Sequence, residues 1–297
     1  VEEVRPEAEP APDVSILMLT RDGAATLPRA LAALDAQETN LRAERVALDS
    51  GSADGTVPLL EGGGFTVHHV APQGFQHGRT RNQGMARCRG ELVLLLVQDA
   101  VPFGPNWLDA LTAPLLRDSR VAGSFARQVP RDDADPLTRF YAGKHPAGPR
   151  ARTPRLIFLH PDQASSLDTL PAAELMELCA FDNVSSCVRR HTWQELPFPE
   201  EPFAEDMAWA REVLAAGHGL AYAPAGVVEH SHHRAVGYEL RRTYLAHRQL
   251  RRRLGRRTVP SPAHLHAAVA GTVGSHLLAL ADDPVHAGRH LPRALAL

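Results

Sequence analysis

The sequence contains few cysteines and almost no lysine. Among its 297 residues are three cysteines, Cys88, Cys179 and Cys187, and a single lysine, Lys144. An odd, sparse set of cysteines without a CxxC pair excludes a disulfide framework and a cysteine-rich zinc site. We therefore expect a reducing, cytoplasmic environment for this chain.

The sequence also lacks a strong net charge and a long apolar run. The formal net charge of -2 at pH 7 argues against a general nucleic-acid-binding protein. Histidines and glycines interrupt the late apolar stretch 264–281, which is too polar for a predicted membrane span. The acidic, proline-rich N-terminus does not resemble a signal peptide. No GxGxxG motif follows the first apolar run, which argues against a dinucleotide-dependent oxidoreductase.

Short apolar runs alternate with amphipathic segments in the first third of the chain. Strands are predicted at residues 14–19, 45–49, 65–70 and 91–97, and helices after Thr26 and at residues 79–88. This alternation predicts an α/β fold with a mostly parallel sheet and helices on both faces. Such sheets bind ligands at the carboxyl ends of their strands.

The composition divides the chain into three regions. Residues 1–12 are rich in Glu and Pro and predict a flexible tail. Residues 13–235 carry the alternating pattern, with later strands predicted at 121–129, 183–188, 220–223 and 227–231 and a helix at 203–216. Residues 236–297 are predicted to be a helical C-terminal region. Within the middle region, residues 132–171 are rich in Pro and Arg, and we expect a mobile segment there.

Polar residues follow the predicted strands at the edge where a ligand is expected. These residues are Thr20, Arg21, Asp22, Asp49, Gln98 and Asp99. If the ligand is a nucleotide, its base needs a hydrogen-bond acceptor. Asp49 is suited to accept a hydrogen bond from the N3–H of a pyrimidine base. Asp99 is suited to hold a divalent cation, because Mg²⁺ and Mn²⁺ accept carboxylate and phosphate oxygens as ligands. A simple helix-capping role remains open for these acids, most of all for Asp54.

Several motifs occur in one order along residues 13–233. They are Val14-Ser-Ile-Leu-Met-Leu-Thr-Arg-Asp-Gly, Leu48-Asp-Ser-Gly-Ser-Ala-Asp-Gly-Thr, Gly78-Arg-Thr-Arg-Asn-Gln-Gly, Leu96-Val-Gln-Asp-Ala-Val-Pro, Arg127-Gln-Val-Pro with Asp135-Pro, Phe203-Ala-Glu-Asp-Met-Ala-Trp, and Glu229-His-Ser-His. Together they resemble the family 2 glycosyltransferases of the GT-A fold, in particular a bacterial rhamnosyltransferase-like branch. The resemblance implies an enzyme that uses a nucleotide-sugar donor.

The resemblance implies a nucleotide pocket and a metal-binding acidic motif. The residues that it assigns to the nucleotide pocket are Thr20, Asp22, Asp49, Arg81 and Gln98. Asp99 belongs to the metal motif, but the sequence has one carboxylate where the family's DxD pattern has two. Either Asp99 is the only acid on a Mn²⁺ or Mg²⁺ ion, with help from elsewhere, or metal dependence is weak.

A histidine cluster offers that help. Residues 230 and 232 point to the same face if they lie on a strand, and imidazole binds first-row divalent metals well. The resemblance favours one of these histidines as a distal metal ligand or diphosphate contact. We assign His230, leave His232 open because isolated histidines are more often structural, and leave out His233.

Two acids begin the helix predicted at residues 203–216. Glu205 and Asp206 are favoured there by the helix dipole alone. An inverting sugar transfer also needs a base that takes the proton of the acceptor hydroxyl. The family has this base in a Glu-Asp pair at a helix start. The resemblance therefore implies that Asp206 is the base and that Glu205 supports it or contacts the acceptor.

The resemblance predicts a direct displacement on a nucleotide sugar, with a saccharide or lipid-linked acceptor. We favour dTDP-L-rhamnose as donor, with a UDP-hexose as the alternative. The arginines of residues 241–257 suit either anionic lipid headgroups at the inner face of the membrane or a solvated helix face.

Two other functions remain open. A nucleotidyltransferase needs a glycine-rich activating loop near the first strand, of which residues 20–25 are a poor version. A non-catalytic sugar-nucleotide-binding or scaffolding protein would explain the missing second acid of the DxD pattern.

Overall fold

The computed structural model of the protein describes residues 10–159, 167, 169–201, 204–232, 236–254, 259, 261–281 and 284–296. The first part alternates strands and helices in the predicted order. Its elements are β1 (Val14–Thr20), α1 (Leu27–Asp35), β2 (Ala43–Asp49), α2 (Thr56–Gly62), β3 (Thr66–His69), the 3-10 helix η1 (Pro72–Gly74), α3 (His77–Met85) and β4 (Leu92–Val97).

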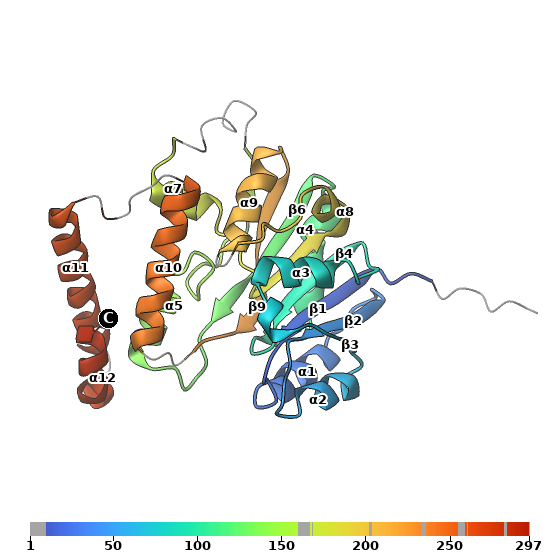
Figure 1. Ribbon diagram of the computed structural model, residues 1–297, viewed down its shortest axis with the longest axis horizontal. Coiled ribbons are helices and arrows are strands. Elements are labelled where there is room, and N and C mark those ends of the chain that lie inside the picture. Colours follow the sequence, from blue (N-terminus) through green and yellow to red (C-terminus); the bar gives the residue numbers. More distant parts are fainter. Residues whose placement is uncertain are drawn as a thin grey trace, which may run out of the picture.

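The second part is more varied, and it ends in helices. Its elements are β5 (Val101–Phe103), α4 (Trp107–Arg117), β6 (Val121–Val129), α5 (Pro136–Lys144), β7 (Arg155–Ile157), α7 (Ala172–Leu178), β8 (Ser185–Arg189), α8 (Arg190–Glu195), α9 (Glu205–Ala215), β9 (Gly219–Glu229), α10 (Val236–Leu254), α11 (Pro262–Ala281) and α12 (Pro284–Ala296). Figure 1 shows the central sheet with α1 and α2 at one end and α10, α11 and α12 at the other.

The sheet has the strand order β3-β2-β1-β4-β8-β6-β9-β5, and β7 also pairs with β9. The strands β3, β2, β1 and β4 are parallel, as predicted. β8 runs antiparallel between β4 and β6, so the second half of the sheet is mixed. The antiparallel strand brings the chain segment before Ser185 to the carboxyl end of β4, where Leu96 pairs with Ser185.

β4 lies in the middle of the sheet and is buried on both faces. Residues 92–96 are each at most 2% exposed. Leu94 and Leu96 pack with α1 and α4 on one face, and Leu95 packs with α3 and α9 on the other. Each such buried leucine contributes roughly 1.5–3 kcal/mol. The unbroken apolar run of the sequence therefore marks the centre of a helix-covered α/β sheet, as predicted.

The end of β9 differs from the prediction. Residues 220–223 and 227–231 were predicted as two strands, but β9 is one strand that ends at Glu229. The pairing of β9 with β6 shifts its register between Ala126 and Arg127, which accommodates residues 224–226 without ending the strand. His230 and His232 therefore follow the strand, and their proximity does not come from strand alternation.

The residue before the first helix does not cap it with its side chain. Thr26 precedes α1, and Pro28 lies in its first turn, but the Thr26 side chain makes no capping hydrogen bond. Its hydroxyl donates instead to the carbonyl oxygens of Gly23 (3.2 Å) and Gln98 (3.3 Å). Thr26 thus ties the loop after β1 to the end of β4. The predicted flexible tail falls mostly on residues 1–9, which lie outside the described residues.

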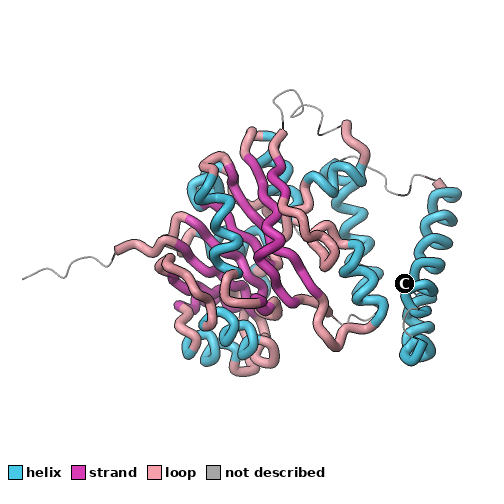
Figure 2. The backbone as a smooth tube through the Cα atoms, turned by 180° about the vertical axis from the view of Figure 1, so that it is seen from behind, coloured by secondary structure: helices cyan, strands magenta, loops and turns pink. Residues whose placement is uncertain are grey.

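The C-terminal helices lie beside α5. α11 and α12 form a hairpin that contacts α5, and α10 stands between this hairpin and the sheet (Figures 1 and 2). The buried His276 of α11 hydrogen-bonds the Tyr141 hydroxyl of α5 and the carbonyl oxygen of Ala294 (2.7 Å). Of the helices that the structure describes, none combines the length and the apolar character that crossing a bilayer requires.

Candidate active site

The predicted site residues gather at one edge of the sheet. Thr20 pairs with Asp49 and Leu19 with Val97, so the carboxyl ends of β1, β2 and β4 are level. β5 pairs with the end of β9, with Val101 opposite Glu229. Asp99 and His230 therefore meet, although they are far apart in the sequence.

The loops after β1 and β2 are interlocked. The Asp22 carboxylate accepts a hydrogen bond from Ala53 N (2.9 Å), and its own backbone N–H donates to the Ser52 hydroxyl (2.8 Å). In return, Asp54 accepts from Ala24 N (2.9 Å). Asp22 has a φ of 46°, in the left-handed region that Asp tolerates better than most residues. About half of its side chain remains exposed.

Asp49 shapes the second of these loops. Its buried carboxylate accepts hydrogen bonds from the backbone N–H groups of Gly51 (3.0 Å) and Ser52 (2.9 Å) and from the hydroxyls of Thr20 and Ser52. Burial by itself raises the pKa of Asp49, but these hydrogen bonds outweigh it and lower the pKa. A pyrimidine N3–H can reach this carboxylate only by sharing or replacing one of the existing bonds.

Gln98 holds the loop after β1 in place. Its Oε1 accepts from Arg21 N (2.9 Å), and its Nε2 donates to Arg21 O (2.9 Å). The amide also packs so closely on Gly23 that a Cβ there would lie 2.6 Å from Gln98 Oε1. The predicted nucleotide contact of Gln98 would therefore have to share these bonds.

Arg81 and Glu205 form a buried ion pair between α3 and α9. The two side chains are 6% and 7% exposed, and the Arg81 guanidinium also lies 5.6 Å from the Phe198 ring centroid. Removing one partner of such a pair leaves a buried charge alone, at a cost of roughly 3–5 kcal/mol. The predicted nucleotide residue Arg81 and the predicted acceptor residue Glu205 are thus partners of each other.

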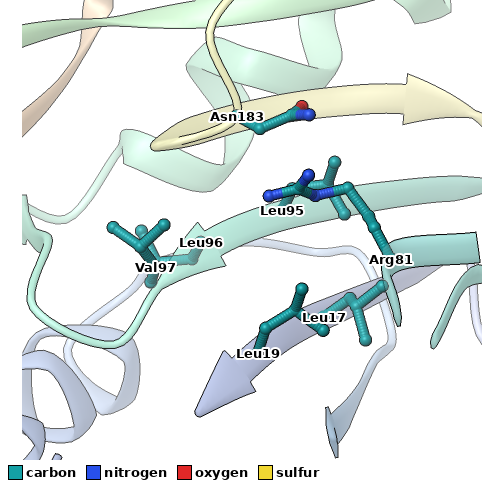
Figure 3. Close-up of a pocket in the computed structure, with 7 residues that line it drawn as sticks. All are labelled: Leu17, Leu19, Arg81, Leu95, Leu96, Val97 and Asn183. Atoms are coloured by element: carbon teal, nitrogen blue, oxygen red, sulfur yellow. The ribbon is translucent and has the colours of Figure 1, made fainter. Parts of the chain in front are cut away.

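A small cavity lies beside this ion pair. Figure 3 shows Arg81 and Asn183 facing it, and its apolar wall comes from β1 and β4: Leu17, Leu19, Leu95, Leu96 and Val97. Asn183 is 3% exposed, and its Nδ2 has no hydrogen-bond partner within the described part of the chain. The cavity has room for about one water molecule. The cavity is therefore too small to hold a nucleotide.

Asp206 has a raised pKa. It lies in the first turn of α9, where Oδ1 accepts from Met207 N (2.8 Å) and Oδ2 accepts from Asn183 N (3.4 Å). Burial raises the pKa of Asp206 to about 7, and the negative charges of Glu205 and Asp182 add to the rise. Near neutral pH, Asp206 can therefore exist in either protonation state.

Asp99, His230 and His232 form a cluster that fits a divalent metal. Their ligand atoms lie within 4.8 Å of one another. His230 Nε2 is 3.8 Å from Asp99 Oδ1, and His232 Nδ1 is 3.3 Å from Asp99 Oδ2. One carboxylate and two imidazoles suit a first-row divalent ion. The structure thus brings His232, which the sequence left open, next to the two assigned residues, whereas His233 lies outside the described residues.

Two site residues escaped the sequence analysis. Gln128 Oε1 lies 3.1 Å from His230 Nδ1, and Gln128 Nε2 donates to Asp182 Oδ2 (2.6 Å). The sequence identified Gln128 only as part of the Arg127-Gln128 motif, and no sequence motif indicated a site role for Asp182. Their roles depend on pairings between distant strands, which the sequence does not display.

The chain matches the family model described as "Glycosyl transferase family 2" over residues 15–167, more than half of its length. It is 27% identical over 240 residues to the O-antigen chain rhamnosyltransferase RfbN of Salmonella typhimurium, which covers 78% of this chain and 70% of the relative. It is 29% identical over 211 residues to the O-antigen chain rhamnosyltransferase WbaN of Salmonella anatum. That match covers 70% of this chain and 62% of WbaN.

Solved structures show the same fold at low identity. The mannosyltransferase PcManGT of Pyrobaculum calidifontis, in complex with GDP-Man and Mn²⁺, aligns with a TM-score of 0.58 at 17% identity, over 99% of this chain and 82% of the other. TarS of S. aureus in complex with UDP-GlcNAc aligns with a TM-score of 0.54 at 14% identity, over 75% of this chain and 59% of the other. These likenesses confirm the predicted GT-A fold. With the family model matched over more than half of its residues, the chain belongs to glycosyl transferase family 2.

Proposed function

We propose that this protein is an inverting glycosyltransferase that moves a sugar from a nucleotide-sugar donor to an acceptor hydroxyl. The observation that carries this proposal is the link between Asp206 and the cluster of Asp99, His230 and His232. Asp182 binds Gln128, which holds His230, while the next residue, Asn183, donates its backbone N–H to Asp206. A carboxyl group with a pKa of about 7 and a candidate cation site therefore contact the same short segment, Asp182–Asn183.

The mechanism that fits this arrangement is a direct displacement. Asp99 and His230 would hold a divalent cation, which would supply positive charge against the departing diphosphate. Asp206 takes the proton of the acceptor hydroxyl while that oxygen bonds to the anomeric carbon. The bond from this carbon to the diphosphate breaks on the opposite side, which inverts the configuration without a covalent enzyme intermediate. Glu205, neutralised by Arg81, fixes the first turn of α9.

We favour dTDP-L-rhamnose as donor, because the curated relatives RfbN and WbaN are both named as rhamnosyltransferases. A UDP-hexose is the second candidate, supported by the TarS structure with UDP-GlcNAc. The acceptor in this proposal is a saccharide or a lipid-linked saccharide, as the O-antigen names of the relatives suggest.

We further propose that α10 makes peripheral contact with the inner face of the membrane, and that the protein is cytoplasmic. Most described side chains of α10 are exposed, including Tyr238, Leu240 and Tyr244. Exposed arginines share this helix: Arg241, Arg242, Arg248, Arg251 and Arg252. An amphipathic, arginine-rich helix of this kind fits an anionic lipid surface.

The substitution Asp206→Asn tests the proposed function. It keeps the size of the side chain but removes the base, so we expect transfer from the donor to fall about 10²–10⁴-fold. Stabilisation by the nucleoside diphosphate should persist, because the nucleotide residues are unchanged. The exposed Asp35→Asn is a matched control that should leave transfer unchanged. Equal transfer by Asp206→Asn and the wild type would rule out this base. Nucleotide binding without transfer in the wild type would favour the scaffolding alternative.

A further inference from the structure

We infer that the hairpin of α11 and α12 is a docking surface for a second copy of this chain, so that the protein forms a dimer through these helices. The inference does not depend on sugar transfer, because it rests on the apolar side chains that the hairpin exposes. These side chains are 40–72% exposed: Leu265, Val269, Leu277, Leu278, Leu291 and Leu295. A concentration of large apolar side chains on one exposed element indicates an interaction site, whereas single ones need no explanation.

The hairpin is anchored to α5 by the C-terminal half of α11. The buried His276 donates through Nδ1 to the carbonyl oxygen of Ala294 in α12 (2.7 Å), and its Nε2 accepts from the Tyr141 hydroxyl of α5. Leu280 and Ala294 also pack on Leu137 of α5. The rest of α11 therefore extends from a fixed base.

The N-terminal half of α11 continues the packed face without a cover. Leu265, Val269 and Val273 precede His276 and Leu280 at spacings of three and four residues, so all five lie on one face of the helix. Leu265 and Val269 are nevertheless 52% and 53% exposed. α11 has 20 residues and α12 has 13, so α12 is about 10 Å shorter and cannot cover the whole of α11. The face that α5 and α12 bury in one half thus lies open in the other.

The lack of charge on α11 favours a second copy as the partner. The sequence of this helix contains no Asp, Glu, Lys or Arg. A two-fold contact brings each residue close to its own counterpart, so a charged helix repels itself there and an uncharged one does not. The neighbouring α10 could not make such a contact, because its arginines would meet arginines.

The same composition distinguishes α11 from a membrane-binding helix. Of the helices within the described ranges, none is long and apolar enough to cross a bilayer. A helix that lies in the lipid interface typically has a basic face and aromatic anchors, and α11 has no basic Lys or Arg and no Trp, Tyr or Phe. Polar residues also interrupt its apolar sequence at His264, His266, Thr272 and Ser275. The surfaces of α10 and α11 thus suit different partners.

The hairpin is large enough for a specific dimer. α11 is about 30 Å long, and two packed helices are about 20 Å wide. Such a face covers about 600 Å² on each copy and about 1,200 Å² in total, which is the lower end for a stable specific interface. We therefore expect a dimer that forms at micromolar concentration.

Sedimentation equilibrium of the full chain in lipid-free buffer tests the inference. The wild type should show about twice the 32.3 kDa of one chain at high micromolar concentration. In the double variant Leu265→Glu and Val269→Glu, carboxylates face carboxylates, so the Kd of the dimer should rise about 100-fold or more. Both side chains are exposed in the single chain, so the circular dichroism spectrum should not change. The control is the pair Leu116→Glu and Leu156→Glu, which changes exposed leucines outside the hairpin and should keep the dimer.

Thiol cross-linking locates the contact. The three native cysteines are buried, so a cysteine introduced at the exposed Val269 is the one that a short bismaleimide reaches. Val269→Cys should give a covalent dimer, whereas Leu116→Cys on α4 should not.

The outcomes separate the possible partners of the hairpin. A wild type that is monomeric at every concentration, or a dimer that the double variant leaves intact, would overturn the inference. Vesicle binding by a monomeric wild type that the double variant abolishes would assign the face to lipid and would also overturn it. A protein that dimerises as described but transfers no sugar would refute the proposed function alone.

Discussion

At the scale of single residues, Asp206 connects the structure to the proposed chemistry. A carboxyl group at a helix start ordinarily has a lowered pKa, because the helix dipole favours its charged form. Here burial outweighs the dipole, and the charges of Glu205 and Asp182 act in the same direction, so the pKa rises to about 7. Asp206 is therefore a stronger base than an ordinary aspartate, at a pH where it still loses its proton.

This pKa predicts the pH dependence of the reaction. A base must be deprotonated to accept the hydroxyl proton, so transfer should increase with pH up to about 7 and level off above it. A profile of kcat/KM between pH 5 and 9 checks this expectation. A rate that is already constant from pH 5 upward would mean that the reaction uses a group with an ordinary carboxyl pKa.

The same shift predicts a change in stability. The folded state binds the Asp206 proton more tightly than the unfolded state does, so this group stabilises the fold fully below pH 3.8, and its contribution is lost as pH rises toward about 7. Asp206→Asn lacks the buried charge. Its melting temperature relative to the wild type should therefore be higher at pH 8 than at pH 5. A difference that is independent of pH would contradict the raised pKa.

The sequence predicted which residues lie in the candidate site better than it predicted their partners. Asp99 follows a predicted strand and Asp206 begins a predicted helix, and the resemblance favoured His230 within the histidine cluster. The sequence did not reveal that Asp49 and Gln98 are occupied by loop hydrogen bonds, or that Arg81 pairs with Glu205 across 124 positions. Such pairings depend on tertiary contacts, which no local pattern encodes.

At the scale of elements, the loop after β1 depends on its closeness to β4. Gly23 lies against the Gln98 amide, and that amide holds Arg21 by two hydrogen bonds. The apolar runs predicted β1 and β4 well, because burial on both faces leaves a strong signal. The sequence could not predict that a side chain of one loop bridges to the other, or that β9 ends at Glu229.

Gly23→Ala tests this packing. The new Cβ would meet Gln98 Oε1 at 2.6 Å and displace it, which breaks both bonds to Arg21. We expect a loss of about 2 kcal/mol, at about 1 kcal/mol for each hydrogen bond, together with weaker nucleotide binding. Chemical denaturation and nucleotide titration measure the two effects. In the control Gly62→Ala no atom lies near the new Cβ, so stability should be unchanged or slightly higher. Equal stability of Gly23→Ala and the wild type would contradict the bridging role of Gln98.

At the scale of the whole molecule, one half of the sheet carries the residues proposed for the nucleotide, and the other carries the proposed base and the histidines. The parallel strands β1, β2 and β4 end in the interlocked loops, while β8, β9 and α9 bring Asn183, His230 and Asp206 to the same edge. The antiparallel β8 makes this meeting possible, because it runs back toward the carboxyl end of β4. The alternating pattern predicted the first half of this arrangement, but the mixed pairing of the second half had no clear sequence signal.

The exposed arginines of α10 predict binding to anionic membranes. Each arginine near such a surface contributes about 1 kcal/mol, so replacing Arg248 and Arg252 by Gln should weaken vesicle binding roughly 30-fold. Co-sedimentation with vesicles that contain an anionic lipid measures this. Exposed arginines elsewhere, Arg87 and Arg117, provide the control pair. Absence of wild-type binding to anionic vesicles would assign α10 to a solvated or protein-facing role.

The most direct test of the central claim is a thermal-shift measurement with dTDP, UDP and GDP, each with and without Mn²⁺. A ligand that binds only the folded state raises the melting temperature, by about 5 °C or more at a hundredfold excess over Kd. We predict that one pyrimidine diphosphate stabilises the protein and that Mn²⁺ enhances the shift. No stabilisation by any of the three at millimolar concentration would contradict a nucleotide-sugar site at the sheet edge.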